Sequence, residues 1–252
     1  MLNASRSPGD FPVPRRWVLP LLENRAESPT VRTFRFSTEG TDFRYLSNQA
    51  VRVALPGVAD PWGAARTFSM SSSPTEPGTL AVTCRISETP FKQALASLRP
   101  GDTAHVIGPL GHFLFDADRP ALFLAGGIGI TPFRGMIRYA VDRELREPMR
   151  LLYSSRSVEE LVFRSELDGL ARDGGPLTVH YTITRPVDSS VAWPGRVGRI
   201  DADWIDRVGG LAGAPRVYVA GLPAMVGEMV TLLQSRFAVP ANDIAYEMFH
   251  GF

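Results

Sequence analysis

The sequence predicts an antiparallel β-barrel domain followed by an α/β domain that is built on a parallel sheet. Up to about residues 116–120, short apolar runs alternate in polarity and are separated by Gly, Pro and Ser, which is typical of antiparallel strands. Beyond that point, strand-like runs alternate with helical patterns, which indicates a parallel sheet with helices on both faces. The 252 residues suffice for two domains of ordinary size. We therefore expect a loose leader over residues 1–16, a barrel over 17–117 and an α/β domain over 118–252.

Five runs in the barrel region have strand character. They are residues 32–37, 50–55, 66–71, 80–86 and 103–108. One helix is expected over residues 91–98, where Pro100 and Gly101 end the pattern. Cys84 shares one face of its strand with apolar residues, so we interpret it as a core residue rather than a catalytic thiol. As the only cysteine, it forms no intrachain disulfide and cannot hold an iron–sulfur cluster, which needs about four thiolates.

The α/β region contains five strand patterns and three helix patterns. The strands are expected at residues 121–125, 149–154, 177–183, 216–220 and 244–249, and the helices at 131–145, 157–171 and 223–237. Ser157 and Glu160 have the spacing of a capping box, which predicts that the second helix begins at Ser157. Glu159 and Glu160 then lie in its first turn, where acidic residues favour the helix dipole, and we assign them no catalytic role.

Composition excludes several classes of function. With 27 basic and 26 acidic residues, the chain lacks the basic excess of a nucleic-acid-binding protein. No run approaches the ~20 apolar residues of a membrane span, and residues 1–17 lack the apolar core of a secretory signal, so we expect a cytoplasmic protein. The four histidines are scattered without metal-ligand spacing, and we therefore expect no metal site.

A glycine-rich motif follows the first strand of the α/β region. The run 121–125 leads directly into GGIGITP, residues 126–132, and then into a helix. Glycines allow a tight turn and a close approach of the backbone to a pyrophosphate, and the helix N-terminus adds free N–H groups. Pro132 suits the first helical position but replaces the third glycine of the ordinary dinucleotide fingerprint. The motif predicts phosphate binding, and a glycine-rich turn without a ligand remains the alternative.

A second motif, RTFSMSSSP, begins at Arg66. Its guanidinium suits a phosphate, Phe68 offers a flat ring and Ser69 offers a hydroxyl. Taken alone, the same pattern fits a barrel strand with a surface arginine.

Five motifs in order resemble the ferredoxin–NADP reductase superfamily over about residues 17–252. They are RTFS (66–69), GPLGHF (108–113), GGIGITP (126–132), YVAGLPAMV (218–226) and the terminal YEMFHGF (246–252). The resemblance implies a Greek-key barrel that binds FAD, with FMN as the less favoured choice. It also implies an NADP(H)- or NAD(H)-binding α/β domain, and hydride transfer from the nicotinamide to the flavin.

The resemblance implies a role for each matching residue of the barrel. Arg66 would hold the flavin phosphate, Phe68 stands where relatives place a tyrosine on the flavin ring, and Ser69 would act in catalysis beside the ring. Lys92 stands where many members carry serine, in a second phosphate-binding turn. The flavin site would further include Thr67, Thr83, Arg85 and Phe91.

The second domain would supply the remaining groups. Thr131 and Glu247 would act in catalysis beside the two rings, and Phe249 or Phe252 would shield the flavin. The nucleotide loops would comprise Gly126, Gly127, Gly129, Thr131, Pro132, Gly221, Leu222, Pro223 and Met225. Ala220 stands where relatives carry a cysteine. Preference for NADPH would rest on Ser155, Arg156, Arg185 and Arg199, although such arginines also occur in users of NADH.

The resemblance implies a stand-alone module that passes electrons to a separate acceptor, such as ferredoxin, flavodoxin or an oxygenase component. We expect a monomer. Two alternatives stay open: a free-flavin or ferric-siderophore reductase, and a non-enzymatic, flavin-binding electron-transfer subunit, which the alanine at position 220 would favour.

Overall fold

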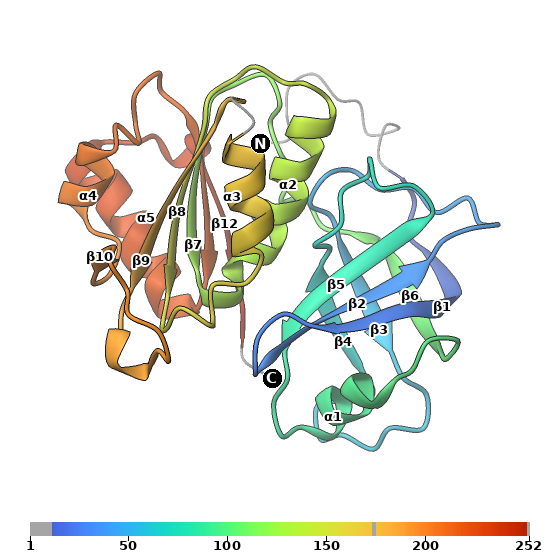
Figure 1. The fold of residues 1–252 in the computed structure, drawn as a ribbon. Coiled ribbons are helices and arrows are strands. Elements are labelled where there is room, and N and C mark those ends of the chain that lie inside the picture. Colours follow the sequence, from blue (N-terminus) through green and yellow to red (C-terminus); the bar gives the residue numbers. More distant parts are fainter. Residues whose placement is uncertain (1–11, 173–174, 251–252) are drawn as a thin grey trace. The chain divides into compact units, whose positions relative to one another are not determined.

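The computed structural model describes residues 12–172 and 175–250 (Figure 1). Contacts divide the chain into two units. The first runs to Phe115 and also includes Arg134–Tyr139, and the second contains Asp116–Phe133 and the chain from Ala140 onward.

The first unit is an antiparallel, nearly closed barrel, which confirms the predicted fold class. Its strands are β1 (Arg15–Ala26), β2 (Val31–Ser37), β3 (Ala50–Ala54), β4 (Ala65–Ser69), β5 (Thr79–Arg85) and β6 (Thr103–Leu110). They are hydrogen-bonded in the order β4-β3-β6-β1-β2-β5. Between β4 and β5, the two ends of this order, there is one isolated bridge, which joins Met70 to Val82. The barrel is therefore least tightly closed along this seam.

Strand β1 is the one barrel element that the sequence did not predict. Its first half pairs with β6 from Arg15 to Pro20, and its second half pairs with β2 as far as Ala26. Pro20, at the point of exchange, weakens the sequence pattern because proline cannot donate to a ladder.

The barrel core is apolar and includes the lone cysteine. Phe34, Val53 and Val82 are fully buried, and Cys84 is 4% exposed, as predicted for a core residue. Helix α1 (Pro90–Ser97) adds Phe91 to this core. Full burial of such a side chain contributes about 1.5–3 kcal/mol to the free energy of unfolding.

The second unit is a parallel six-stranded sheet with helices on both faces. Its strands are β7 (Ala121–Gly126), β8 (Met149–Ser155), β9 (Leu177–Ile183), β10 (Arg196–Val197), β11 (Arg216–Gly221) and β12 (Ile244–Met248), in the order β10-β9-β8-β7-β11-β12. Its helices are α2 (Ile130–Asp142), α3 (Arg164–Arg172), α4 (Ala202–Arg207) and α5 (Pro223–Phe237).

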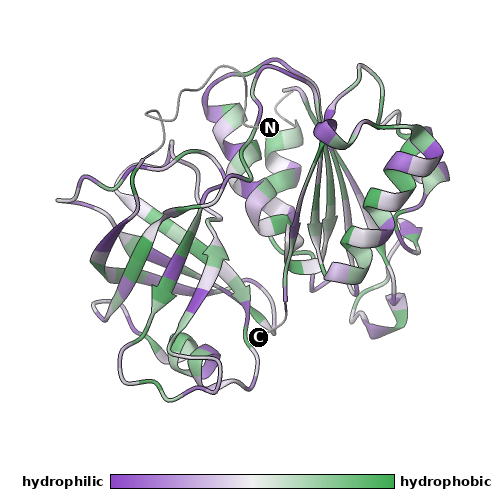
Figure 2. Ribbon diagram, turned by 180° about the vertical axis from the view of Figure 1, so that it is seen from behind, coloured by the Kyte–Doolittle hydropathy of each residue, from purple (hydrophilic) through white to green (hydrophobic). Residues whose placement is uncertain are grey.

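Alternate residues of the strands bury against opposite layers. Helices α2 and α3 lie on one face of the sheet and α4 and α5 on the other (Figure 1). Phe123 stacks on Tyr218 and packs against Phe133 of α2, whereas Leu124 faces the cluster that contains Trp204 of α4 and Leu233 of α5. The strands of this sheet are coloured mostly as hydrophobic in Figure 2, as burial on both faces requires.

The predicted start of the second helix at Ser157 was wrong. Helix α3 begins at Arg164, and Phe163 before it has a left-handed φ of 62°. The segment before it makes other hydrogen bonds. The Ser155 hydroxyl donates to the Glu160 carbonyl at 3.0 Å, and the Glu159 carboxylate accepts from the backbone N–H of Ser190. Tertiary hydrogen bonds therefore outweigh the capping-box pattern.

Candidate functional site

The glycine-rich motif forms the turn between β7 and α2. Gly127 has a φ of 54°, which favours glycine, and a 3-10 turn over Gly127–Gly129 leads into the helix. A Cβ on Gly129 would lie 2.1 Å from the carbonyl oxygen of Ala220, so only glycine fits there. Pro132 is the third residue of α2 rather than the first, which is equally compatible with its missing N–H.

The second nucleotide loop lies beside the first at the carboxyl edge of the sheet. Strand β11 pairs with β7 and ends at Gly221, Leu222 is the N-cap of α5, and Pro223 is its first residue. Met225 faces the glycine turn, since its Sδ lies 3.0 Å from the position of a Cβ on Gly126. Because the helices that follow β7 and β11 cover opposite faces, this is the topological switch point, where open α/β sheets bind ligands.

Two residues that the sequence analysis assigned to catalysis lie at the same edge. Thr131 is 3% exposed, and its hydroxyl donates to the Ile128 carbonyl at 3.1 Å. Glu247 lies on β12 opposite Ala220. Phe249 donates its N–H to the Gly221 carbonyl at 2.9 Å, and Phe252 lies outside the described residues.

The residues predicted to select NADPH lie on neighbouring strand ends. The backbone N–H of Arg185 donates to the Arg156 carbonyl, which sets the two arginines side by side beyond β8 and β9. The Arg156 Nε pairs with Asp188 at 2.6 Å, and Arg199 lies 3.5 Å from Glu228. Arg185 is exposed, and no carboxylate in the described part of the chain pairs with it. It is thus the cation most available to a phosphate.

In the barrel, β4 and α1 bring together the residues that the sequence analysis assigned to the flavin phosphate. The Arg66 side chain is 10% exposed and lies over the Phe91 ring, 5.1 Å from its centroid. The rings of Phe68 and Phe91 stack at 6.3 Å. The Arg66 Nε is buried and has no hydrogen-bond partner. A guanidinium beside a helix N-terminus fits a phosphate, and the unsatisfied Nε adds a donor for one.

Lys92 belongs to the same cluster. It is 6% exposed, and its ammonium lies 4.6 Å from the centroid of the Phe68 ring, close to the Cys84 thiol. Burial raises the pKa of that thiol, although Lys92 opposes the change. Among the described residues no carboxylate pairs with Lys92.

Asp60 also stands in this cluster, although no sequence motif pointed to it. Its carboxylate accepts hydrogen bonds from Arg66 Nη2 at 2.7 Å, from the Phe91 N–H at 2.9 Å and from the Trp62 N–H at 2.8 Å. Burial by itself would raise the pKa of Asp60, but these hydrogen bonds and the Arg66 charge outweigh it and hold the pKa below its ordinary value. A lone acid in a loop with glycines on both sides, six residues before Arg66, was the only available sign.

Other residues assigned to the flavin lie less favourably. Thr67 is exposed and points away from the face of β4 that carries Arg66 and Phe68. The Thr83 hydroxyl shares hydrogen bonds of 2.8 Å with the hydroxyls of Thr33 and Ser71. The Arg85 side chain donates a hydrogen bond to the Thr30 hydroxyl. Ser69 is the last residue of β4 and is buried.

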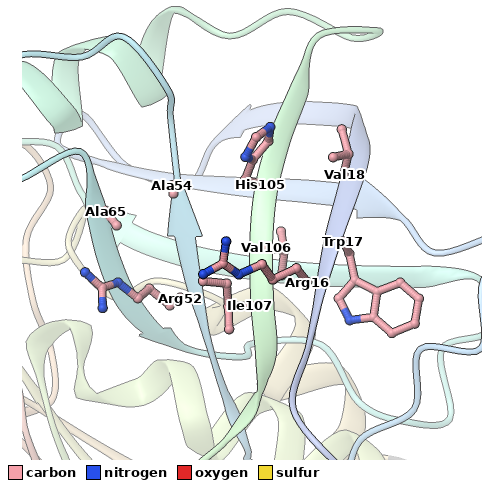
Figure 3. Close-up of a pocket in the computed structure, with 9 residues that line it drawn as sticks. All are labelled: Arg16, Trp17, Val18, Arg52, Ala54, Ala65, His105, Val106 and Ile107. Atoms are coloured by element: carbon pink, nitrogen blue, oxygen red, sulfur yellow. The ribbon is translucent and has the colours of Figure 1, made fainter.

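A cavity of about 560 Å³ on the outer face of β1, β6, β3 and β4 contains none of the assigned residues. Arg16 extends across β6 toward β3, and Arg52, Ile107 and His105 also line the cavity (Figure 3).

Across residues 12–172 and 175–250, His, Cys, Asp and Glu form no group of three that could hold a metal ion. Over the same residues, no helix has the length and apolar character needed to cross a membrane.

Comparison with known proteins agrees with this division. Residues 18–115 match the model of the oxidoreductase FAD-binding domain, and residues 123–231 match that of the oxidoreductase NAD-binding domain. The chain is 32% identical to ferredoxin–NADP reductase B of Sorangium cellulosum, over 91% of this chain and 96% of that protein. It is 28% identical to one component of the Na⁺-translocating NADH-quinone reductase of Klebsiella pneumoniae over 74% of this chain, but it spans only 49% of that relative's length.

Solved structures share the fold at low sequence identity. The cytochrome P450 reductase GcoB of Amycolatopsis matches with a TM-score of 0.80 and 22% identity, over 94% of this chain and 70% of that one. A ferredoxin NADP⁺ reductase from Neisseria gonorrhoeae with bound FAD and NADP matches with a TM-score of 0.72 and 21% identity, over 94% of this chain and 99% of that one. This chain therefore belongs to the ferredoxin–NADP reductase superfamily and is a flavoenzyme oxidoreductase with an FAD-binding domain and an NAD-binding domain.

Proposed function

We propose that this protein takes electrons from NADPH through FAD and delivers them to a separate carrier protein such as ferredoxin or flavodoxin. The barrel, residues 17–117, would hold FAD, and residues 118–252 would hold the nicotinamide dinucleotide. We further propose a cytoplasmic monomer, which cell fractionation and size-exclusion chromatography would test.

The observation that carries the proposal is the buried cluster on β4 and α1. Arg66 and Lys92 bring two positive charges, and Asp60 brings one negative charge, so the cluster keeps a net charge of about +1. Buried charges are expensive unless they are paired, and an unmatched cation next to flat rings favours an anionic, aromatic ligand. A flavin nucleotide has both a phosphate and a planar ring.

Each side chain then has a defined task. Bound FAD supplies the two-electron acceptor for the nicotinamide. Arg66 and Lys92 would hold its phosphates, and Phe68 would pack against its ring. The buried Ser69 hydroxyl is a hydrogen-bond partner for the reacting edge of the ring.

In the second unit, the glycine turn and the N-terminus of α2 receive the pyrophosphate of the dinucleotide. Thr131 and Glu247 would lie beside the nicotinamide. Similarity to a ferredoxin–NADP reductase and the exposed cation at Arg185 support NADPH over NADH.

Anaerobic reduction of the purified protein by NADH and NADPH in parallel tests the proposal. NADPH should bleach the visible flavin absorbance faster, and adding oxidised ferredoxin or flavodoxin should restore it. A protein that takes up neither FAD nor FMN would contradict the proposal.

A second candidate is supported by Asp60. A carboxylate at the phosphate-binding donors predicts weak retention of flavin, as in a reductase for which flavin is a substrate. Such an enzyme would reduce free FMN or ferric chelates without any carrier protein.

A further inference from the structure

The Asp60 carboxylate is buried, although the loop that carries it is mostly exposed. Over residues 56–64 the loop is largely open to solvent, and Trp62 is 59% exposed. The Asp60 side chain, in contrast, is 0% exposed. The loop therefore inserts one charged group into the barrel and leaves most of its remaining side chains outside.

The partners of this carboxylate are those that a phosphate would use. One oxygen accepts from Arg66 Nη2 at 2.7 Å, and the other accepts from the Phe91 N–H at 2.9 Å, in the first turn of α1. Helix α1 has Thr89 as its N-cap, and the Thr89 side chain makes no capping hydrogen bond. The carboxylate thus takes the place of both a cap and an anionic ligand.

The carboxylate satisfies this cluster only in part. The Arg66 side chain is nine-tenths buried, and its Nε has no hydrogen-bond partner. With Asp60 in place, the net charge of Asp60, Arg66 and Lys92 is about +1, and with Asp60 withdrawn it becomes about +2. The second value matches the two negative charges of a diphosphate ester.

The loop has two positions at which its backbone can turn. Gly57 has a φ of 87° and Gly63 a φ of 85°, and a Cβ at either position would meet no atom within 4 Å. The hydrogen bond from the Leu55 N–H to the Ala64 carbonyl at 2.9 Å holds the base of the loop. Withdrawal of Asp60 would turn the segment at these two glycines and break the hydrogen bonds that Arg66 Nη1 donates to the Trp62 and Gly63 carbonyls, while the strands on either side stay paired.

We propose that the Asp60 carboxylate is an internal competitor for the flavin phosphate, and that it must leave Arg66 and the α1 N-terminus before flavin binds tightly. This inference rests on the proposed flavin site at Arg66. Asp60 is then a determinant of flavin affinity. When flavin dissociates, the carboxylate returns to Arg66 and the α1 N-terminus and stabilises the flavin-free protein, which favours exchange of flavin.

Equilibrium titration with FAD, followed by quenching of flavin fluorescence, tests the proposal. Asp60→Asn removes the charge and keeps an oxygen that can accept from the N–H groups. It should lower the Kd for FAD by about tenfold or more, whereas Arg66→Met should raise it. Asp42→Asn is the matched control, because Asp42 is an exposed barrel carboxylate that pairs with Arg15.

Inorganic pyrophosphate separates this inference from the proposed function. Calorimetry should show tighter pyrophosphate binding by Asp60→Asn than by the wild-type protein, with or without any affinity for flavin. Equal or weaker binding of pyrophosphate by Asp60→Asn would overturn the competition. If the variant binds pyrophosphate more tightly but no form binds flavin, competition at an anion site is supported and the flavin function fails.

A measurement on the wild-type protein covers the case in which Asp60→Asn does not fold. The backbone N–H of Trp62 donates to the Asp60 carboxylate, so withdrawal of Asp60 displaces the backbone that carries the indole. Saturating pyrophosphate should change the tryptophan emission of the wild-type protein and leave that of Trp62→Phe nearly unchanged. Unchanged wild-type emission would overturn the proposal.

Discussion

The carbonyl oxygen of Ala220 lies 2.1 Å from the position that a Cβ would occupy on Gly129. The two nucleotide loops of the parallel sheet therefore pack backbone against backbone. A methyl group at this position would force β11 and the glycine turn apart.

Gly129→Ala should therefore weaken NADPH binding strongly and lower the free energy of unfolding by about 1–3 kcal/mol, the usual cost of overpacking. Fluorescence titration with NADPH and urea unfolding measure the two effects. Gly227→Ala is the control, because Gly227 lies in α5 and a Cβ there would meet no atom within 4 Å. This control should stabilise the protein by about 0.5–1 kcal/mol. An unchanged Kd for NADPH in Gly129→Ala would contradict the assigned role of the turn.

Lys92 is the only lysine of the chain, and its ammonium lies over the Phe68 ring. Lys92→Met keeps the packing of the aliphatic stem and removes the charge. We expect the Kd for FAD to rise by about tenfold, which corresponds to about 1.4 kcal/mol. Arg99→Met removes an exposed charge just after α1 and should leave the Kd unchanged. The role of Lys92 in phosphate binding would be wrong if both variants behaved alike.

The 6% exposure of Lys92 also predicts slow acylation by amine-reactive reagents. Bound FAD should slow it further, and peptide mass spectrometry can follow Lys92 separately from the N-terminal amine.

Arg185 should determine coenzyme preference. Arg185→Ala should raise the KM for NADPH by about tenfold, or about 1.4 kcal/mol, and change the KM for NADH little, because NADH lacks the 2′-phosphate. Arg199→Ala, which removes a cation already close to Glu228, should have the smaller effect. Steady-state kinetics with both coenzymes distinguish this from a general loss of activity, in which both KM values would rise together.

His180 should make stability sensitive to mild acid. Burial, with a smaller contribution from Arg150, holds the pKa of His180 below its ordinary value of 6.5. As the pH falls below that value, the unfolded chain binds a proton that the folded chain resists, so the free energy of unfolding decreases. Well above pH 6.5 the histidine is neutral in both states, and this loss in the free energy of unfolding is absent.

His180→Gln should therefore flatten the decline of the unfolding midpoint between neutral pH and pH ~5. His105→Gln, at an exposed position of β6, is the control in the same urea titrations. An equal slope in wild type and His180→Gln would exclude this histidine as the cause.

The periodic apolar patterns predicted helices and strands correctly where the buried residues recur at regular spacing along the chain. Strand β9 and helix α5 have the predicted bounds, because their apolar periodicity is uninterrupted. Helix α3 starts later than predicted because Glu159, in the segment before it, accepts a hydrogen bond from Ser190, which is 31 residues away in the sequence. Strand β1 was missed because it changes partners near Pro20.

The candidate site shows the same limit. Arg66 and Gly129 belong to motifs that are contiguous in sequence, so they could be predicted. Asp60 could not, because its importance depends on which N–H groups it meets, and Phe91 is 31 residues away.

The seam between β4 and β5, bridged only from Met70 to Val82, has a consequence for the dynamics of the barrel. A barrel that lacks a full ladder at one point opens there first, because few hydrogen bonds must break. Amide hydrogens of β4 that face the seam should exchange with solvent well before those of β3, which pairs with strands on both sides. Arg66 and Phe68 are thus carried by one of the two strands that border this seam, where small rearrangements cost least.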